Sequence, residues 1–559
     1  MQKLKKIIAL VLCISIALLS CGCGMLESYI NPPETRSYYA EGTEAGPYRD
    51  NLENFQDMEY VRLEIKTLED KADAVRALLD DFFSHGEDIM KALNDFVSEY
   101  WNYETMLTLA LLRSDIDIED EYYLDEYNYC AQNEAEVHQI MEELFADCYD
   151  SSHYLYLDTY YFYGNLDEKY SYDDTYDDEY VSMLNDEAEL LSQYDVLLNE
   201  FYNDGAEDYD KYYDDAANIY IELIKLRREM ADYLEYDSYA DMCYEDYGRD
   251  YSYEDTVDYC DAVKKYIVPL FEKSLDNGVY SDAYLYGLSS INPEDALEVV
   301  RDTVCPLDKN FEKAMNCMTE YGLFDVSASD SKTGGSYMTY LYSYDAPFMY
   351  VDPVGTYEDV LTIAHEFGHF SQNFRNHGNC MSLDSDEVFS QGMEYLLLCN
   401  MEDGNMKEQL TDFKMMDCIM VYVFQGCLNQ FENEVYNTPT DELTPEYLSE
   451  LFASCMDEFG YDVEGQEESY GHCWIDIGHL FNYPFYVISY LVSDTAAFRL
   501  YSMELEEEGS GLESYLALVR GSARHSFIEL LEKKGLGSPL DTDTIKNMSI
   551  ILSEKLELG

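Results

Sequence analysis

Residues 356–374 read TYEDVLTIAHEFGHFSQNF, and this stretch decides the fold because it predicts a buried helix that carries chemistry. His365 and His369 are four residues apart, so on a helix both imidazoles lie on the same face and can reach one metal ion. Glu366, beside the first histidine, can then face a water molecule held by that ion. Zinc bound in this way keeps a coordination position open and brings the pKa of its water toward neutrality. The stretch therefore predicts hydrolysis of an amide bond, with Glu366 as the general base.

The residues around this motif favour an ordered helix over a loop. Thr356 and Asp359 frame a predicted capping box at the start of the helix. Apolar residues then recur at helical spacing as a buried stripe, namely Val360, Ile363, Phe367 and Phe374. The alternative is a core helix that carries two histidines by coincidence.

A zinc site of this kind needs a third protein ligand, for which Glu387 is the best candidate. The interval from His365 to Glu387 allows one helix to end, turn at Gly378-Asn379 and return as a second helix. Glu394 lies on the same face of that second helix, so one carboxylate can bind the metal while the other orients a ligand imidazole. The alternative is that Glu387 merely belongs to an acidic helix start favoured by the helix dipole.

From about residue 334 to about residue 497 the chain resembles a known group, the zinc oligopeptidases of the thimet oligopeptidase and oligoendopeptidase F family (gluzincin metallopeptidases). The second motif of that family is matched by Glu387, Ser390 and Glu394. Residues 335–337 and 347–350 resemble the edge strand that precedes the zinc helix in the family.

This resemblance implies a Zn²⁺ cofactor bound by His365, His369 and Glu387, with Glu394 in a supporting position behind a ligand histidine. Many relatives carry a further histidine where this chain has Gln372.

A third block, residues 478–490, is similar to the family's histidine followed by a tyrosine-rich helix. The resemblance implies that His479, Tyr486 and Tyr490 are catalytic, hydrogen-bonding the substrate and the developing oxyanion. Pro484 must break or kink the helix in this block, and Tyr486 and Tyr490 are expected to share a face beyond it. The alternative is chance spacing, because the chain contains 57 tyrosines.

The amino-terminal residues predict export and lipidation. A basic leader precedes an apolar run of signal-peptide length that ends in Leu18-Leu19-Ser20-Cys21, similar to a bacterial lipoprotein cleavage box. We expect residues 1–20 to be a lipoprotein signal peptide, Cys21 to carry the lipid and residues 21–51 to form a tether. The protein would then lie on the outer face of the bacterial cytoplasmic membrane. The alternative is a leader retained as a membrane anchor.

Composition restricts the partners. Lys and Arg number 34 against 115 Asp and Glu, which gives a formal net charge of −81. Such a surface repels nucleic acid, attracts cations and favours neutral or basic peptides. The family resemblance implies short peptides as substrates, and the predicted lipid anchor implies the membrane as a further partner. The chain has no Gly-x-Ser-x-Gly elbow, and its remaining histidines are scattered, so a serine or cysteine nucleophile has no support.

We expect a mostly α fold with two helical lobes, and the resemblance to the metallopeptidase family implies a deep central channel between them. Apolar periodicity predicts an N-terminal helical lobe over residues 52–325 and a zinc-binding catalytic lobe over residues 326–559. A small β-sheet near residues 335–352 is expected beside the zinc helix. An exposed edge strand of that sheet could pair with the backbone of a substrate.

Together these patterns predict a zinc-dependent metalloendopeptidase that hydrolyses short oligopeptides at the cell surface. The alternative from another class is a non-catalytic lipoprotein that captures peptides on the same fold. The intact Glu366 argues against that alternative, because a pure binder has no use for a base beside the metal.

Overall fold

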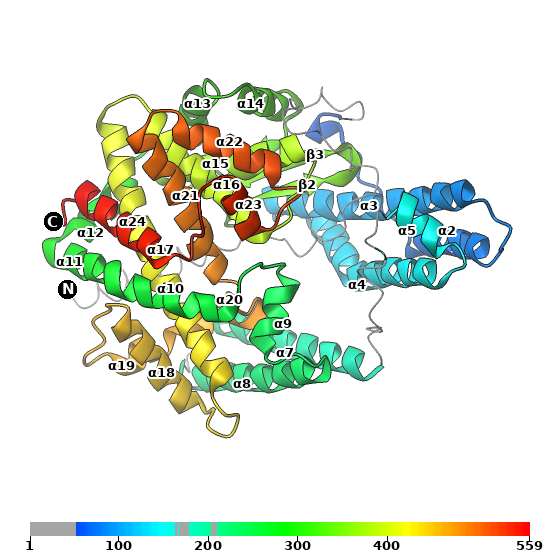
Figure 1. Cartoon of the computed structure of the whole chain (residues 1–559), viewed down its shortest axis with the longest axis horizontal. Helices are drawn as coiled ribbons and strands as arrows, with labels where there is room; N and C mark the ends of the chain where they lie inside the picture. The colour runs from blue at the N-terminus through cyan, green and yellow to red at the C-terminus, as the bar shows by residue number, and fades with distance from the viewer. Residues whose placement is uncertain (1–51, 163–165, 167–177, 203–208) are drawn as a thin grey trace.

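The computed structural model describes residues 52–162, 166, 178–202 and 209–559, and the predicted signal peptide, Cys21 and the tether lie outside these residues. The described chain is predominantly α-helical, and its strands form one three-stranded sheet (Figure 1). The predicted fold class, mostly α with a small sheet beside the zinc helix, is confirmed. Among the described helices, none combines the length and the apolar character that crossing a bilayer requires.

The first helices form a hydrophobic cluster of their own. After η1 (Phe55–Asp57) come α2 (Ile65–Leu79), α3 (Gly86–Ile116), α4 (Glu121–Asp150) and α5 (Tyr154–Tyr160). Their apolar faces meet around buried residues such as Phe96, Trp101 and Leu144. Figure 1 shows this group projecting at the right of the molecule.

The helices of the middle of the chain share a second, larger cluster with the C-terminal part. They are α7 (Asp178–Tyr202), α8 (Tyr209–Tyr233), α9 (Tyr239–Asp246), α10 (Tyr253–Tyr266), α11 (Val268–Asn277), α12 (Val279–Gly287), α13 (Pro293–Val304) and α14 (Lys309–Tyr321). The boundary between the two clusters falls within α3, whose Tyr103 belongs to the first cluster and whose Met106 belongs to the second. Hydrophobic packing therefore does not divide the chain near residue 325, and the predicted lobe boundary stays a prediction.

The sheet lies directly before the zinc helix. It consists of β1 (Phe324–Asp325), β2 (Ser336–Leu341) and β3 (Ala346–Val351), with η2 (Tyr342–Tyr344) connecting β2 to β3. The strand order is β1-β3-β2, with β3 parallel to β1 and antiparallel to β2. The prediction that residues 347–350 form an edge strand is therefore wrong. β3 is fully buried in the middle, since its apolar residues pack on both faces, and β2 is an edge.

The zinc motif lies on α15 (Glu358–Asn376), and α16 (Leu383–Asn400) returns after a turn at His377 and Gly378. This helix–turn–helix arrangement was expected, but the predicted capping box is absent. Asp359 instead accepts hydrogen bonds from the backbone N–H groups of Val354 and Gly355, at 2.9 and 2.8 Å. The physical reason is that the backbone N–H of Asp359 donates to the carbonyl oxygen of Thr356 at 3.0 Å and not to its hydroxyl, which has no hydrogen-bond partner among the described residues.

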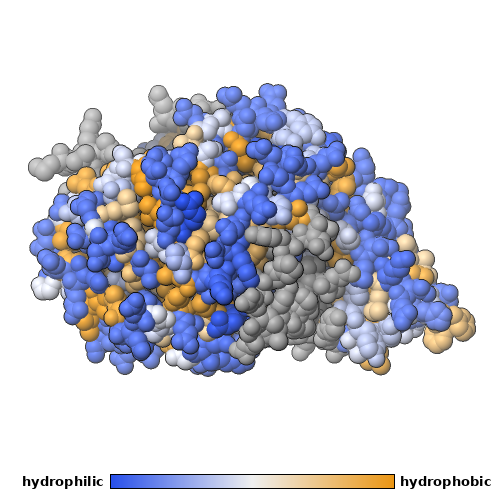
Figure 2. All heavy atoms as spheres, turned by 90° about the horizontal axis from the view of Figure 1, so that it is seen from above, coloured by the Kyte–Doolittle hydropathy of each residue, from blue (hydrophilic) through white to orange (hydrophobic). Residues whose placement is uncertain are grey.

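The C-terminal helices complete the larger cluster. They are α17 (Asn405–Asn437), α18 (Pro445–Glu458), α19 (Glu467–Gly471), η3 (Cys473–Asp476), α20 (Gly478–Asn482), α21 (Ile488–Glu506), α22 (Ser510–Gly521), α23 (Phe527–Lys533) and α24 (Thr542–Lys555). Of these, α17, α21 and α22 contact α16, and α21 packs most extensively along it. The face of the molecule in Figure 2 is mostly hydrophilic, as the acidic composition predicts.

α15 and α16 approach each other closely at Gly368, inside the zinc motif. A Cβ atom at Gly368 would lie 2.4 Å from the carbonyl oxygen of Phe389 and 2.6 Å from Cα of Ser390. Both are backbone atoms, so no side-chain rotation can relieve the overlap. The absence of a side chain at this position sets the distance between the two helices.

We predict that Gly368→Ala pushes α15 away from α16 and lowers the free energy of unfolding by about 1–3 kcal/mol or more, the usual cost of overpacking. Urea denaturation followed by circular dichroism measures the change. The control is Gly404→Ala, since a Cβ there meets no atom within 4 Å. Equal stability of the Gly368→Ala variant and the wild type would contradict the close packing.

Candidate metal centre

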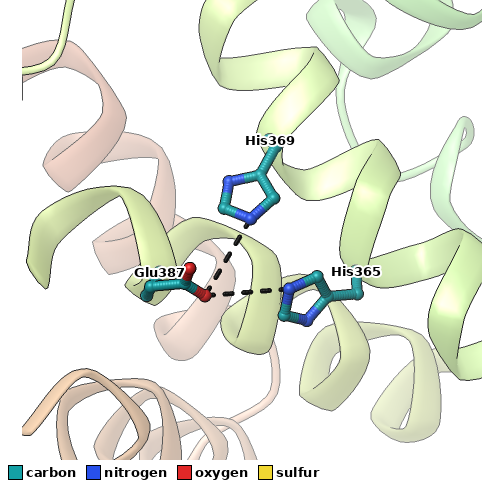
Figure 3. Close-up of side chains that lie close together, drawn as sticks. All are labelled: His365, His369 and Glu387. Carbon is teal, nitrogen blue, oxygen red and sulfur yellow. Dashed lines mark ion pairs between the residues drawn. The ribbon is translucent and has the colours of Figure 1, made fainter. Parts of the chain in front are cut away.

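The two histidines of the motif converge on Glu387 from the neighbouring helix. His365 Nε2 lies 3.7 Å and His369 Nε2 3.9 Å from the same oxygen, Oε2 of Glu387. Figure 3 shows both imidazoles of α15 pointing toward this carboxylate on α16. His369 and Glu387 are buried, whereas 27% of the His365 side chain is exposed, so solvent reaches the site from that side. The structure thus brings together the three predicted metal ligands.

These residues fit a zinc ion. Separations of 3.7 and 3.9 Å are too long for hydrogen bonds. Ligands at about 2.0–2.2 Å from one tetrahedral zinc lie roughly 3.4 Å apart, close to the separations seen here. In addition, buried Nε2 of His369 has no hydrogen-bond partner among the described residues. Two imidazoles and a carboxylate are the donor set that zinc accepts while keeping a position open.

Each ligand histidine is held from behind by a carboxylate of α16. His365 Nδ1 donates a hydrogen bond to Glu394 Oε1 at 2.9 Å, as expected for the supporting position. His369 Nδ1 lies 3.2 Å from Asp386 Oδ2. Sequence analysis did not identify Asp386 as a partner of His369, because spacing along α16 does not show which ring a carboxylate meets. A carboxylate on Nδ1 leaves Nε2 of each ring facing the metal position.

A buried lysine completes the support of His365. Lys414 of α17 lies 2.8 Å from Glu394 Oε2, and both side chains are buried. Burial alone would raise the pKa of Glu394, but Lys414 and His365 together lower it below its ordinary value. Sequence analysis missed Lys414, although a lysine between Phe413 and Met415 in an apolar stretch predicts a buried partner.

The second motif has structural roles beyond Glu387 itself. Ser390 Oγ donates hydrogen bonds to the backbone carbonyl and to Oε2 of Glu387, at 2.9 and 3.2 Å.

Gln372 of α15 stands where relatives carry a histidine. Its side-chain amide donates to the carbonyl of Asn379 at 3.0 Å and therefore stabilises the turn between the helices.

Glu366, the predicted base, is buried beside the ligands. Its Oε2 has no hydrogen-bond partner among the described residues. Burial raises the pKa of Glu366 above its ordinary value, and the neighbouring histidines oppose this shift. A carboxylate whose pKa is raised is a stronger proton acceptor, as a general base requires.

His479 and the tyrosines form a separate aromatic cluster. The hydroxyl of Tyr490 lies 3.5 Å from His479 Nε2, and the Tyr486 ring centroid lies 5.6 Å from that of His479 and 5.3 Å from that of Tyr490. Burial lowers the pKa of His479 to about 4, so its ring is neutral at physiological pH. The cluster adjoins α16, because Gln391 donates to the carbonyl of Tyr490 at 3.5 Å.

Pro484 breaks the helix as expected, but Tyr486 and Tyr490 do not adjoin by sharing a helical face. Pro484 separates α20 from α21, and α21 begins only at Ile488, so Tyr486 lies on the connecting segment. The chain turns sharply there, since Phe485 adopts a left-handed conformation with φ of 60°. The two rings meet through this turn.

A centre of two histidines and one glutamate on adjoining helices of a mostly helical fold, with a glutamate after the first histidine, defines the gluzincin class. The chain belongs to peptidase family M3, whose members are zinc metallopeptidases. The description Peptidase family M3 matches residues 283–550, and Peptidase M3 N-terminal domain matches residues 55–162. The predicted family is confirmed.

Relatives in sequence and structure agree with this assignment. The chain is 25% identical over 257 residues to oligopeptidase PepF of Bacillus subtilis, covering 44% of this chain and 38% of the relative. It is 21% identical over 278 residues to the chromosomal oligoendopeptidase F of Lactococcus lactis subsp. cremoris, covering 47% of this chain and 46% of the relative. The matches thus span less than half of these curated relatives. The structure of PZ peptidase A with an inhibitor superposes with a TM-score of 0.71 at 20% identity, over 90% of this chain and 99% of that chain, and shows a shared fold.

We predict that Glu394→Gln weakens zinc binding by about 10- to 100-fold, because loss of the charge loosens His365 and leaves buried Lys414 with only the more distant carboxylate of Asp417, at 3.7 Å. Competition with a chromophoric chelator measures the affinity. Asp403→Asn is the matched control, since the side chain of Asp403 is 100% exposed on the loop after α16. An unchanged affinity in the Glu394→Gln variant would show that this contact does not orient the ligand.

Proposed function

We propose that the protein is a zinc-dependent metalloendopeptidase that hydrolyses peptide bonds in short oligopeptides. The observation that carries the proposal is the convergence of His365, His369 and Glu387 on one point, with buried Glu366 in the same turn of α15. Membership of peptidase family M3 supports it, as do relatives named oligopeptidase and oligoendopeptidase.

His365, His369 and Glu387 would hold the zinc ion. When bound, the ion would act as a Lewis acid that activates water and polarises the scissile carbonyl. Glu366 accepts the proton of the attacking water and passes it to the leaving amine, which its raised pKa favours. Glu394 and Asp386 keep His365 and His369 in the tautomer that presents Nε2.

We propose that the aromatic cluster stabilises the tetrahedral intermediate. Tyr490 and Tyr486 carry hydroxyl groups that can donate to the oxyanion of the tetrahedral intermediate, and neutral His479 orients the Tyr490 hydroxyl. A donor that meets charge present only in the transition state raises kcat more than it changes KM. The acidic surface supports a preference for neutral or basic peptides.

We predict that Glu366→Gln retains zinc but loses cleavage of an internally quenched peptide by about 10²- to 10⁴-fold, because the amide cannot accept the proton. Metal analysis and fluorescence measure the two properties on the same sample. Glu402→Gln, at an exposed position after α16, should keep full activity. If zinc stays bound and the wild type is as inert as the variant, the peptide-capturing alternative holds instead.

We also propose that the protein acts at the outer face of the bacterial cytoplasmic membrane, held by a lipid on Cys21. Support comes from the basic leader, the apolar run and the Leu18-Leu19-Ser20-Cys21 sequence.

We predict that Cys21→Ala abolishes incorporation of labelled fatty acid, because the accepting thiol is lost. Labelling in the native bacterium measures the effect. The matched control is Cys23→Ala, which removes the weaker lipidation candidate two residues later and should leave labelling intact. Equal labelling of the wild type and the Cys21→Ala variant would contradict lipidation at this residue.

A further inference from the structure

A second group of potential metal ligands lies in the N-terminal helices, outside the centre described above. It consists of Glu104 on α3 and of Glu134 and His138, one turn apart on α4. One ligand atom from each residue lies within 4.8 Å of the others. Among the described residues, this spacing is met only here and by the His365, His369 and Glu387 group. α3 and α4 lie side by side (Figure 1).

Glu104 is the distinctive member of this group. Its side chain is 1% exposed, and neither carboxylate oxygen has a hydrogen-bond partner among the described residues. Its nearest charged contact is His138 Nε2, 3.4 Å from Oε1. Burying an ionised carboxylate without hydrogen bonds is costly, so native structures pair such groups or use them to bind metals.

We propose that Glu104, Glu134 and His138 form a second divalent-cation site that joins α3 to α4. Two carboxylates and one imidazole are donors that Zn²⁺ and Mn²⁺ accept. The side chain of His138 is 37% exposed, so a cation can enter from solvent and water can complete its coordination. The negative charge of the whole chain concentrates cations around such a site.

The simpler interpretation is an ion pair between protonated His138 and Glu104. The pKa of His138 is raised, since Glu104 stabilises the imidazolium and outweighs burial. An ion pair engages only one oxygen of Glu104, however, and leaves the other buried oxygen without a partner among the described residues. Glu134 enters such an ion pair only through its charge, which helps to raise the pKa of His138. A cation engages all three residues and satisfies the buried carboxylate.

The position of the site indicates a structural role. Trp101 lies one turn before Glu104 on α3, and its ring centroid is 4.1 Å from that of Tyr342 in η2. Thr105, the residue directly after Glu104, accepts a hydrogen bond from the backbone N–H of Ser343 at 2.9 Å. A cation that fastens α4 to α3 at this level therefore braces the contact between the N-terminal helices and the β2–β3 connection.

The experiment counts zinc ions on the full chain. Protein stripped with a chelator is dialysed against Zn²⁺ with a weak competing chelator, which removes loosely held surface ions, and bound zinc is measured by mass spectrometry. We expect two ions per chain in the wild type, one in His138→Ala, one in His369→Ala and none in the double variant. His138→Ala should retain peptide cleavage, and its thermal midpoint should no longer rise at the zinc concentration that fills the second site.

A matched pair on α4 provides the control. Glu134→Gln should lose the second ion, whereas Glu136→Gln, two residues away and exposed, should retain it. If His138→Ala fails to fold, Glu104→Gln replaces it in the experiment, because glutamine keeps the shape of the buried side chain. This variant should also lose the second ion. The proposal is overturned if His138→Ala and Glu134→Gln bind as many ions as the wild type. If the wild type binds one ion that only the His138→Ala change removes, this site stands and the proposed catalytic centre fails.

Discussion

The close approach of α15 to α16 is the constraint on which the metal centre depends. Three ligands from two helices can meet one ion only if the helix axes lie near enough for short side chains to converge. Gly368 allows this, because its missing Cβ would otherwise overlap the backbone of Phe389 and Ser390. Ser390, whose backbone lies against Gly368, holds the Glu387 carboxylate from within α16. The spacing of the two helices that carry the ligands thus depends on a residue without a side chain.

Electrostatics explains why the centre suits a cation. Glu366, Asp386, Glu387 and Glu394 gather around two imidazoles, and Lys414 balances only one of the carboxylates. Burial alone would lower the pKa of His369, but Asp386 and Glu387 raise it to about 10. Metal-free protein therefore holds protons where the metal binds, so zinc affinity is expected to fall as pH falls.

The proposed second site also uses carboxylates and a histidine to bind a cation, but there the cation would have a structural role. At the candidate metal centre the carboxylates orient histidines that face a solvent-accessible position. In the N-terminal helices, a buried carboxylate on α3 faces two ligands on α4 beside the contact with η2. A strongly acidic chain can use cations in place of the lysines and arginines that it lacks, because only 34 of its 559 residues are basic.

The fold class, the family and the three candidate ligands on α15 and α16 followed from the order of residues alone, because apolar periodicity and motif spacing are local properties of the chain. Asp386 and Lys414 could not be assigned from spacing, since their partners lie on other helices and only packing shows which carboxylate meets which ring. The position of β3 in the middle of the sheet also required the structure, because strand order is a long-range property. So did the cluster of Glu104, Glu134 and His138, which joins two helices through side chains that no local pattern connects.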